Sequence, residues 1–547
     1  MLSFCVRQIH SSAWFLTVLS AVLQIVIFPL PGLYVLSWFA LAPLMVALLR
    51  ARSIGALEIN GSSKLQPAAP AQAFLLAYVC GILWYMGTCY WIYDTMHQYG
   101  GIAPPLALLI LFLFSLYLAL YHGLFGLLIG LLAARSRQQA SQSWRALAGA
   151  PFVWVAVELA RTRVTGFPWN LLGIAQVDNA ALSRIAQWTG VYGVSFEIAV
   201  INVAIAAAFL VPRKKRGALL MAALASAVVL QAGRLIDPPA SVSDRAALLL
   251  QENIPVAADW SQPLFESTLK DLSSLSERSV SEADNGARNK GQTVPDLIVW
   301  PESPAPFFTN DPFFRGAIGD VGRHTNVWVV TGAIGTSPAT QGGSHASQMF
   351  NSAALVSPEG QWTARYDKAH LVPFGEYLPF PSLFSFAGGL TKEVGEFTPG
   401  QSRIPLDAGG SRLGVFICYE SIFPDDVRQF ANNGAQVFVN ISNDGWYGDS
   451  GAYAQHLNQT RMRAIENDRW ILSATNTGVT ASIDPWGRLA AQIPRKVRAT
   501  LVAAYALTSV TTFYTRHGDW FAYLCAIISA GALLLRFASR KKVETSS

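Results

Sequence analysis

Cys418 is the residue of this chain whose type and surroundings are best suited to covalent chemistry. It ends the apolar run 413–418 and is followed by Tyr419 and Glu420. The other four cysteines lie in or beside strongly apolar segments: Cys5, Cys80, Cys89 and Cys525. A thiol with no second thiol in its own polar region is either a buried filler or a nucleophile, and a nucleophilic thiolate forms covalent intermediates.

A carboxylate and an ammonium group occupy comparable positions in the sequence. Glu302 follows the apolar run 297–301, and Lys368 follows residues 365–367. Because α/β sheets bind ligands beyond the carboxyl ends of their strands, an acid, a lysine and a thiol at three strand ends can converge on one crevice. Each residue also has a purely structural interpretation: Glu302 as a helix cap or salt-bridge partner, Lys368 as a solvated charge and Cys418 as a core residue.

An α/β domain must hold these strand ends, because short apolar runs alternate with polar helical stretches between about residues 244 and 506. The predicted buried strands are 246–251, 297–300, 327–333, 413–418, 437–441 and 471–474, and the predicted helices lie near 311–324, 424–433 and 453–468. Strands this apolar are typical of a sheet that is covered on both faces. The charged segment 273–292 is predicted to be a solvated loop.

The rest of the chain is predicted to lie in a membrane. Hydrophobic residues make up 52% of the chain and charged residues only 14%, whereas roughly a quarter of an average soluble protein is charged. Asp, Glu, Lys and Arg are missing from residues 11–49, 65–93 and 102–134, and a spanning helix needs about 20 apolar residues. We predict a polytopic α-helical membrane protein with about eight spans, near 13–30, 33–49, 71–93, 104–133, 146–160, 191–211, 217–233 and 519–536.

The basic residues orient these spans. With eight spans and a cytoplasmic N-terminus, the short outer loops hold only Arg161, Arg163 and Arg184. Without the weak fifth span, which contains Glu158, this bias nearly disappears. The α/β domain is therefore expected on the outer face, the periplasm of a Gram-negative cell. The basic residues on the cytoplasmic side are Arg7, Arg50, Arg52, Lys64, Arg135, Arg137, Arg145, Arg213, Lys214, Lys215, Arg216, Arg536, Arg540, Lys541 and Lys542.

Several other chemistries find no support in the sequence. It contains no Gly-x-x-x-x-Gly-Lys, His-Glu-x-x-His or Cys-x-x-Cys motif, so neither nucleotide nor zinc is indicated, and no metal or other cofactor is expected. The net charge of +6 is modest, and the basic residues cluster at the ends of spans. This pattern indicates membrane topology rather than nucleic-acid binding.

Three ordered motifs resemble those of the nitrilase superfamily, and the layout of the chain resembles its membrane branch, the apolipoprotein N-acyltransferase family. The motifs are Trp300-Pro301-Glu302; Tyr366-Asp367-Lys368 with His370-Leu371-Val372-Pro373-Phe374-Gly375-Glu376; and Cys418-Tyr419-Glu420. Two further segments are similar to that family: Gly166-Phe167-Pro168-Trp169-Asn170 and Ser442-Asn443-Asp444-Gly445-Trp446-Tyr447. The resemblance implies an inserted nitrilase-like αββα sandwich at 239–510, between seven spans at 1–238 and a final span with a basic cytoplasmic tail at 511–547.

The resemblance also implies roles for these residues. Glu302 would be the general base, Lys368 would stabilise charge on the tetrahedral intermediate, and Cys418 would be the nucleophile. Glu376 and Glu420 match supporting acids of the family, although Glu420 has the alternative of a structural partner of Lys368. An ordinary thiol has a pKa of about 8.5, and the lysine and the base are expected to shift Cys418 toward the thiolate. A backbone N–H near Tyr419 would share the oxyanion with Lys368.

The implied reaction is a ping-pong acyl transfer. Cys418 would take an acyl chain from a membrane phospholipid, and the amino group of an N-terminal S-diacylglyceryl cysteine on an apolipoprotein would then accept it. The enzyme would be a monomer in the bacterial inner membrane. One alternative is a membrane-anchored carbon–nitrogen hydrolase (an amidase or nitrilase) that uses water as the acceptor. A non-enzymatic scaffold with a degenerate nitrilase domain is disfavoured, because Glu302 and Lys368 accompany the thiol.

An apolar loop beside Glu376 suits a lipid substrate. Its large apolar side chains make it either a membrane-facing lid or a segment packed on the spans; they are Phe374, Tyr377, Leu378, Phe380, Leu383, Phe384 and Phe386. Trp446 and Tyr447 are expected to line the same cleft. Trp260 is a candidate for substrate binding or for core packing. Glu197, within the sixth span, is a functional candidate or a structural partner of Asn202 or an arginine.

Overall fold

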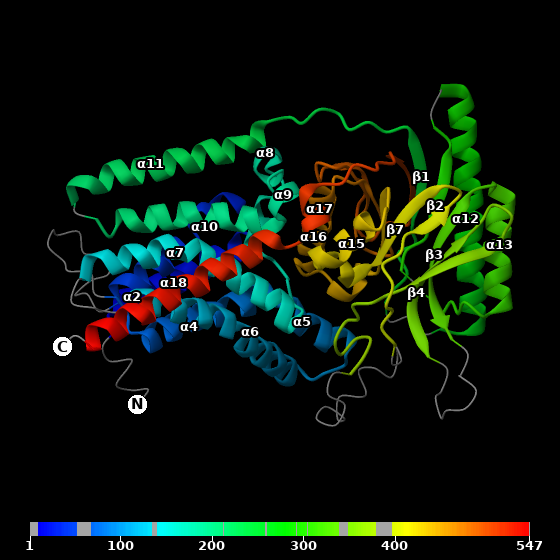
Figure 1. The fold of residues 1–547 in the computed structure, drawn as a ribbon. Coiled ribbons are helices and arrows are strands. Elements are labelled where there is room, and N and C mark those ends of the chain that lie inside the picture. The colour runs from blue at the N-terminus through cyan, green and yellow to red at the C-terminus, as the bar shows by residue number, and fades with distance from the viewer. Residues whose placement is uncertain are drawn as a thin grey trace.

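The computed structural model contains a helical bundle and a two-sheet sandwich that lie side by side (Figure 1). It describes residues 9–51, 67–133, 139–211, 213–256, 260–290, 293–302, 305–337, 348–378 and 397–545. The bundle collects the N-terminal helices and the last helix of the chain. The sandwich is formed by the segment between them, with its first strand at β1 (Arg245–Gln251) and its last at β12 (Ala499–Tyr505).

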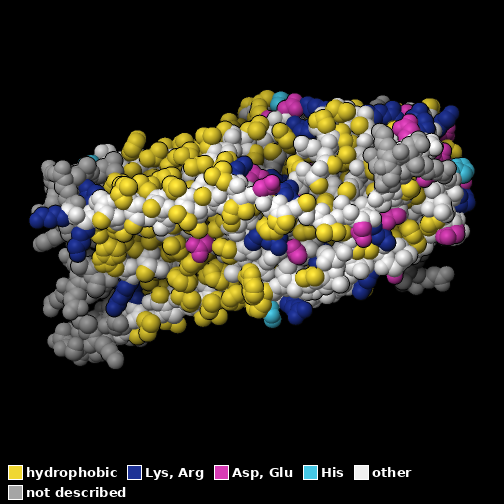
Figure 2. Space-filling model, turned by 90° about the horizontal axis from the view of Figure 1, so that it is seen from above, with side chains coloured by type: hydrophobic (Ala, Val, Ile, Leu, Met, Phe, Trp, Pro, Cys, Tyr) yellow, Lys and Arg dark blue, Asp and Glu magenta, His cyan; other side chains and the backbone are white. Residues whose placement is uncertain are grey.

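Apolar helices make up the bundle. The helices described are α2 (Ser11–Val26), α3 (Ala42–Arg50), α4 (Pro70–Thr88), α6 (Pro104–Ala133), α7 (Gln139–Ala160), α10 (Val191–Ala208), α11 (Arg213–Ala232) and α18 (Trp520–Thr545). Among the described residues, five helical stretches are long and apolar enough to cross a membrane: 70–88, 104–133, 191–208, 214–235 and 520–538. Hydrophobic side chains cover the bundle in Figure 2, whereas charged side chains gather on the sandwich and at the opposite tip. These features confirm the predicted multi-span membrane region.

Two of the predicted spans have a different form from the one expected. The span predicted at 33–49 is a 3₁₀ turn, η1 (Tyr34–Trp38), followed by the short helix α3. The break has a local cause, because the Asn202 side chain accepts hydrogen bonds from the N–H groups of Leu41 (2.8 Å) and Ala42 (3.0 Å). The weak fifth span is the complete helix α7, and its buried Glu158 accepts a hydrogen bond from the N–H of Leu172 (2.7 Å).

Basic side chains cap helices at the end of the bundle away from the sandwich. Arg50 donates to the carbonyl of Phe209 (3.1 Å), just beyond α10, and Arg536 donates to that of Leu132 (2.9 Å), in the last turn of α6. Cations at helix C-termini satisfy free carbonyls and interact favourably with the helix dipole. Arg50 and Arg536 both belong to the basic residues that the sequence predicts on the cytoplasmic side, and the structure places both at this end of the bundle.

The arginines at the other end of the bundle bind acidic groups near or in the sandwich. Arg163 lies 3.0 Å from Asp425 and 2.7 Å from Asp519. Arg184 lies 3.2 Å from Asp468. Two of the three arginines that the sequence assigns to outer loops, Arg163 and Arg184, thus join the two parts of the molecule. The third, Arg161, instead donates to the hydroxyl of Tyr85 within the bundle (3.0 Å).

Two six-stranded sheets pack face to face in the sandwich. One has the strand order β12-β1-β2-β3-β4-β5 and the other β11-β10-β9-β8-β7-β6. In each sheet the central pairs are parallel, β1 with β2 and β2 with β3, and β7 with β8 and β8 with β9, while the outer pairs are antiparallel. The remaining strands are β2 (Pro295–Val299), β3 (Trp328–Thr336), β4 (Met349–Val356), β5 (Trp362–Asp367), β6 (Leu406–Ala408), β7 (Ser411–Ile417), β8 (Val437–Ser442), β9 (Ile471–Thr475), β10 (Thr480–Ile483) and β11 (Leu489–Ile493).

Helices cover both outer faces of the sandwich, which confirms the predicted αββα architecture. The helices α12 (Gln262–Lys290) and α13 (Pro312–Thr325) lie on the face away from the bundle (Figure 1). The helices α15 (Pro424–Asn432) and α16 (Ala452–Asn467) lie on the face toward it. All six predicted strands and the three predicted helices are present within a few residues of their expected ends.

The loop predicted at 273–292 is wrong, because residues up to Lys290 belong to α12. The apolar residues of α12 recur at helical spacing and pack against the core under the first sheet: Phe265, Leu269, Leu272 and Val280. Ser276, on the same face, accepts a hydrogen bond from the indole of Trp300 (3.0 Å). The charged residues that suggested a loop form the solvated side of an amphipathic helix.

The turn that follows β7 lies at the boundary between the sandwich and the bundle. Tyr419, Ile422 and Phe423 belong to the same buried apolar cluster as the bundle helices. Gln455 of α16 donates to the carbonyl of Pro29 (2.6 Å) and accepts from the indole of Trp169 (2.7 Å). The fold therefore places the end of β7 directly against the membrane helices.

Candidate active site

Cys418 is the first residue of a short 3₁₀ turn, η7 (Cys418–Ile422), at the carboxyl end of β7. Its backbone has φ = 48°, in the left-handed region that a residue with a Cβ adopts at a cost of about 1–3 kcal/mol. The side chain is buried. A sharp strand-to-turn transition presents the thiol beyond the end of the sheet, where the sequence predicted the crevice to be.

Lys368 lies at the corresponding end of β5 and is fully buried. Its Nζ is 2.9 Å from Oε1 of Glu376 and 3.4 Å from Oε1 of Glu302. Burial alone would lower the pKa of this ammonium, but the carboxylates of Glu376 and Glu302 outweigh it and raise the pKa. Lys368 is therefore a fixed positive charge, not a solvated surface lysine.

Glu302 follows β2 and is held by three hydrogen-bond donors. Its Oε1 accepts from Nδ2 of Asn351 (2.7 Å) and from Lys368, and its Oε2 accepts from the N–H of Asn443 (2.8 Å). Nδ2 of Asn351 also lies 2.5 Å from Oε1 of Glu376. The first sheet thus supplies the carboxylate and Asn351, and the loop after β8 supplies the backbone donor.

Glu302, Lys368 and Cys418 meet as the sequence predicted, but the thiol differs from expectation. Burial raises the pKa of Cys418 well above its ordinary value, Glu302 raises it further, and Lys368 lowers it. The expected shift toward the thiolate is therefore wrong for the resting enzyme. The reason is that the thiol is enclosed beside a carboxylate, and both the lost hydration and the negative charge favour the protonated form.

Alkylation of Cys418 tests this protonation state. We expect iodoacetamide to modify Cys418 slowly at pH 7 and faster with each step above pH 9, because only the thiolate reacts and its fraction rises toward the elevated pKa. Peptide mass spectrometry of the folded protein gives the rate, and the unfolded protein, with an ordinary thiol pKa of about 8.5, gives the reference. A rapid rate that is constant from pH 6 to pH 9 would mean that a thiolate is already formed at neutral pH.

Glu376 and Glu420 have different tasks in this arrangement. Glu376 contacts Lys368 through Oε1 and accepts the N–H of Val372 (2.7 Å) through Oε2, so it orients the lysine. Glu420 does not hydrogen-bond Lys368 in the part of the chain that the structure describes and instead joins two strand ends. Its Oε1 accepts from the Tyr366 hydroxyl (2.7 Å) and the Ala369 N–H (2.7 Å), and its Oε2 accepts from the N–H of Ile417 (2.8 Å).

Replacement of Glu420 by glutamine is therefore expected to loosen the site. The amide group of glutamine cannot accept hydrogen bonds at both of its ends, and each lost bond to a charged acceptor costs about 1.5–3 kcal/mol. Thermal unfolding in detergent should show a lower midpoint, and acyl transfer should fall even at temperatures where the variant is folded. Glu359→Gln is the matched control, since Glu359 is exposed and its carboxylate accepts from the nearby Ser357 hydroxyl (2.6 Å). Equal midpoints and activities for the two variants would contradict this account of Glu420.

Two of the residues predicted to bind substrate, Tyr447 and Trp446, contact aromatic residues of the bundle. Tyr447 lies 5.3 Å from Trp91 and 5.9 Å from Trp169 between ring centroids, and Trp446 lies 5.7 Å from Tyr99. These contacts bring the loop after β8 against aromatic residues of the bundle. Trp260, another of the predicted residues, instead packs against the core under the first sheet.

The three other candidates from the sequence are Tyr419, in the turn η7, and Phe374 and Tyr377, in the segment after β5. The hydroxyl of Tyr419 lies 3.3 Å from the carbonyl of Gly166, in the bundle segment that resembles the family. Phe374 adopts φ = 64° and its N–H donates to the carbonyl of Tyr377 (2.8 Å), which forms a tight turn before Leu378. The rest of the predicted lid, from residue 379 onward, lies outside the described residues.

Glu197 is half-buried on α10, and Asn202 does not bind it. The Asn202 amide is used elsewhere, since its Nδ2 donates to the carbonyls of Ser37 and Ile198 (both 2.8 Å). The predicted pairing of Glu197 with Asn202 is therefore wrong. The functional alternative for Glu197 stays a prediction.

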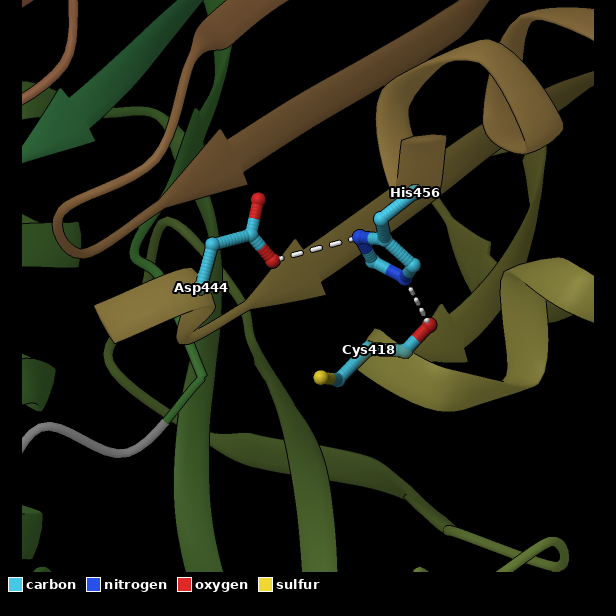
Figure 3. Close-up of side chains that lie close together, drawn as sticks. All are labelled: Cys418, Asp444 and His456. Atoms are coloured by element: carbon cyan, nitrogen blue, oxygen red, sulfur yellow. Dashed lines mark hydrogen bonds and ion pairs between the residues drawn. The ribbon is translucent and has the colours of Figure 1, made fainter. Parts of the chain in front are cut away.

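Asp444 and His456 lie beside Cys418 (Figure 3). The sequence placed Asp444 in the family-like segment 442–447 without a role of its own, and His456 was not singled out. Nδ1 of His456 is 3.2 Å from Oδ1 of Asp444, and its Nε2 is 3.0 Å from the carbonyl oxygen of Cys418 and 2.8 Å from Oγ of Ser421. Potential ligand atoms of Cys418, Asp444 and His456 all lie within 4.8 Å of one another. Both nitrogens of the ring already have hydrogen-bond partners, so the cluster is organised around the histidine rather than around a vacant centre.

Of the site residues that were not predicted from the sequence, Asn351 has a recognisable sequence signal and His456 has none. Asn351 is a polar residue inside the otherwise apolar strand β4, which marks a buried amide that must be hydrogen-bonded. His456 has no comparable mark, because an amphipathic helix such as α16 contains polar residues at many positions. Its proximity to the thiol arises from the packing of α16 against η7.

Comparison with known proteins agrees with this architecture. Residues 20–204 match the family described as apolipoprotein N-acyltransferase N-terminal domain, and residues 261–514 match the carbon-nitrogen hydrolase family. A relative from Geobacter metallireducens, named apolipoprotein N-acyltransferase, is 33% identical over 538 residues, which is 97% of this chain and 96% of the relative. The chain belongs to the apolipoprotein N-acyltransferase family. A second apolipoprotein N-acyltransferase, from Shewanella oneidensis, is 31% identical over 83% of this chain and 85% of its own.

Among solved structures, an amidase from Nesterenkonia sp. is similar over 52% of this chain and 97% of its own, with 18% identity and a TM-score of 0.36. Membership of the apolipoprotein N-acyltransferase family confirms the predicted family and the prediction that the chain is an enzyme. The alternative of a membrane-anchored hydrolase is not favoured, because the relatives match the bundle as well as the sandwich.

Proposed function

We propose that the chain transfers an acyl chain from a membrane phospholipid to the N-terminal amine of an S-diacylglyceryl cysteine on apolipoproteins, through a thioester on Cys418. The observation that carries the proposal is the position of the buried Cys418 thiol. It lies within electrostatic reach of Glu302 and Lys368, and the next residue, Tyr419, packs in the apolar cluster of the bundle. A thiol in this position can react with an ester from the membrane without leaving the protein interior. Family membership supplies the acceptor.

The first half-reaction forms the acyl-enzyme. Because the resting thiol is protonated, Glu302 takes its proton as Sγ attacks the ester carbonyl of the phospholipid. Lys368 faces the negative charge that develops on the carbonyl oxygen, and its fixed charge needs no reorganisation during the step. Collapse of the tetrahedral intermediate breaks the carbon–oxygen bond. Glu302 returns the proton to the departing oxygen, so a lysophospholipid leaves and a thioester remains on Cys418.

The second half-reaction regenerates the thiol. The neutral amine of the diacylated cysteine attacks the thioester carbonyl, and Glu302 accepts a proton from the nitrogen. The carbon–sulfur bond then breaks, the proton passes to Cys418 and the amide product leaves. The same carboxylate acts first as base and then as acid in each half, which is consistent with its place between Lys368 and the backbone N–H of Asn443.

The substrates would reach this site from the bundle side. Aromatic side chains from both parts of the molecule line the boundary beside Cys418, and we assign the acyl chain to this wall: Trp91, Trp169, Tyr419 and Tyr447. Phe374, Tyr377 and Trp446 stay candidates for substrate binding. Trp260 is given a lower weight, because it packs in the core away from the bundle.

We place the enzyme in the bacterial inner membrane as a monomer, with the sandwich in the periplasm. Residues 1–238 and 511–547 form the membrane part, and residues 239–510 form the catalytic domain. The basic caps at the bundle end away from the sandwich support this orientation through the positive-inside rule. A cysteine introduced at Asp449, which is exposed on the sandwich, should react with a membrane-impermeant maleimide in intact spheroplasts, and protection of that cysteine would reverse the orientation.

An acceptor assay separates acyl transfer from hydrolysis. Purified protein is incubated with phospholipid that carries a labelled acyl chain and with a synthetic diacylated lipopeptide that has a free N-terminal amine. The label should appear in an amide on the lipopeptide, and an N-acetylated lipopeptide should accept none. Release of labelled fatty acid at the same rate with and without the free amine would instead establish a hydrolase.

A further inference from the structure

His456 holds the backbone carbonyl of the nucleophile. Its Nε2 lies 3.0 Å from the carbonyl oxygen of Cys418, and its Nδ1 lies 3.2 Å from Oδ1 of Asp444. Figure 3 shows this carbonyl directed at the ring while the Sγ atom of the same residue points away from it. All three residues are buried. His456 therefore does not take the thiol proton in this arrangement and must act on the turn itself.

The partners of the ring determine its protonation. A carbonyl oxygen only accepts hydrogen bonds, and so does an ionised carboxylate, so both nitrogens of His456 must carry a proton. Asp444 is suited to the acceptor role, since its Oδ1 also accepts from the hydroxyl of Ser442 (2.6 Å). Burial would lower the pKa of His456, but Asp444 and the Cys418 carbonyl outweigh it and raise the pKa. Together with the hydrogen bonds, this direction favours an imidazolium paired with Asp444, and Oγ of Ser421, 2.8 Å from Nε2, can accept from the same Nε2–H.

The orientation of this carbonyl determines the orientation of a neighbouring N–H. In a trans peptide the C=O and the following N–H point in opposite directions within one plane, and no peptide bond described in this structure is cis. If the carbonyl of Cys418 is fixed on His456, the N–H of Tyr419 is fixed on the opposite side, the side to which Sγ is directed. Tyr419 is the second residue of η7, so its N–H has no acceptor within the turn.

The bundle contributes to the rigidity of the ring. The imidazole of His456 stacks on the indole of Trp169, with the planes 11° apart and the centroids at 6.3 Å. The preceding residue, Gln455, accepts a hydrogen bond from the same indole (2.7 Å). A side chain fixed by two hydrogen bonds and an aromatic face holds its partner within the narrow tolerance that catalysis demands.

We propose that His456, oriented by Asp444, is a positioning residue that fixes the Cys418–Tyr419 peptide so that the N–H of Tyr419 and the ammonium of Lys368 together bind the oxyanion. The inference rests on the proposed thioester chemistry and extends it to residues outside the Glu302–Lys368–Cys418 set. The positive charge on the ring adds to the effect, because it polarises the peptide and strengthens the N–H as a donor.

The test compares His456→Gln, His456→Ala and Asp444→Asn in the full-length protein. Glutamine can still donate to the Cys418 carbonyl but carries no charge, whereas alanine removes the bond. We expect His456→Ala to lower kcat for acyl-enzyme formation by about 10²–10³-fold with KM for the phospholipid unchanged, which is the typical cost of one oxyanion donor. His456→Gln should recover a substantial part of that loss. Asn458→Ala, half-buried on the same helix, should match the unmodified protein.

A spectroscopic readout separates positioning from folding. The acyl-enzyme is formed from phospholipid with a ¹³C-labelled acyl carbonyl, and the infrared stretch of its thioester is recorded. Hydrogen bonds to the carbonyl oxygen lower this frequency, so the band should move to higher wavenumber in His456→Gln and Asp444→Asn, both of which can be checked for an unchanged unfolding midpoint. A structural defect alone would reduce the amount of acyl-enzyme without moving the band.

The outcomes distinguish this inference from the proposed function. If the unmodified protein forms no thioester on Cys418, the proposed function fails and the inference fails with it. If the thioester forms but His456→Ala and Asp444→Asn keep the unmodified kcat, and Asp444→Asn also keeps the unmodified band position, the inference alone is overturned. A shifted band with a lowered kcat and a constant KM supports it.

Discussion

Replacement of Cys418 by alanine is expected to abolish acyl transfer. The loss should be on the order of 10⁶-fold in kcat, as when a covalent nucleophile is removed from other enzymes, so activity should fall to the background of the assay. None of the other described cysteines can substitute, since they lie in or next to the bundle helices: Cys80, Cys89 and Cys525. The measurement is the transfer of labelled acyl chains to a diacylated lipopeptide by purified protein.

Two further variants make this result specific. Cys525→Ala removes a buried thiol of α18 and should retain activity, which shows that the loss belongs to the position and not to thiols in general. Cys418→Ser should also be inactive, because a hydroxyl is a poorer nucleophile than a thiol and the base is a carboxylate. The account of catalysis would be contradicted if Cys418→Ala retained more than a few per cent of the activity while its unfolding midpoint was unchanged.

Replacement of Lys368 by methionine should have the second-largest effect. The side chain keeps its length but loses its charge, so the oxyanion loses its cation and kcat should fall by about 10²–10³-fold. The same change leaves Glu302 and Glu376 buried without their shared counterion. Removal of one partner from a buried ion pair typically costs about 3–5 kcal/mol, so the unfolding midpoint should fall as well.

The double variant Lys368→Met/Glu376→Gln separates the two effects. It removes one of the two carboxylates together with the ammonium, so most of the lost stability should return, whereas the oxyanion still has no cation. We therefore expect the unfolding midpoint to recover and acyl transfer to stay low. Recovery of both would mean that Lys368 is needed for the fold alone and would contradict its role in the reaction.

The strands and helices of the sandwich were predictable because local patterns decide them. Runs such as 437–441 and 471–474 are apolar on both faces, and only a strand covered by a second sheet and by helices can bury them. The spans were predictable for a similar reason, since a long uncharged segment has few alternatives to a membrane. The segment 273–290 was not predictable from charge, because its burial depends on the sheet beneath it.

Only part of the site was predictable from the sequence, namely the residues Glu302, Lys368 and Cys418. Glu302 and Cys418 lie at the ends of apolar runs and Lys368 belongs to the motif 366–368, so their convergence follows from the topology of an α/β sandwich and from the family resemblance. His456 joins them through the packing of α16 on the turn after β7, a contact between residues 38 apart in sequence that has no local pattern, whereas Asp444 lies after β8 in the segment 442–447 that resembles the family. The raised pKa of Cys418 likewise depends on burial, which a sequence does not quantify.

The central claim is that the acyl chain rests on Cys418 between donor and acceptor, and a pulse-chase experiment with intact-protein mass spectrometry tests it most directly. After incubation with phospholipid alone, the protein should gain the mass of one acyl chain, located on the Cys418 peptide and removed by hydroxylamine. Addition of the diacylated lipopeptide should remove that mass and yield an equal amount of N-acylated peptide. The account would be contradicted if the lipopeptide became acylated while the protein never carried the chain, or if the acylated protein persisted unchanged in the presence of the acceptor.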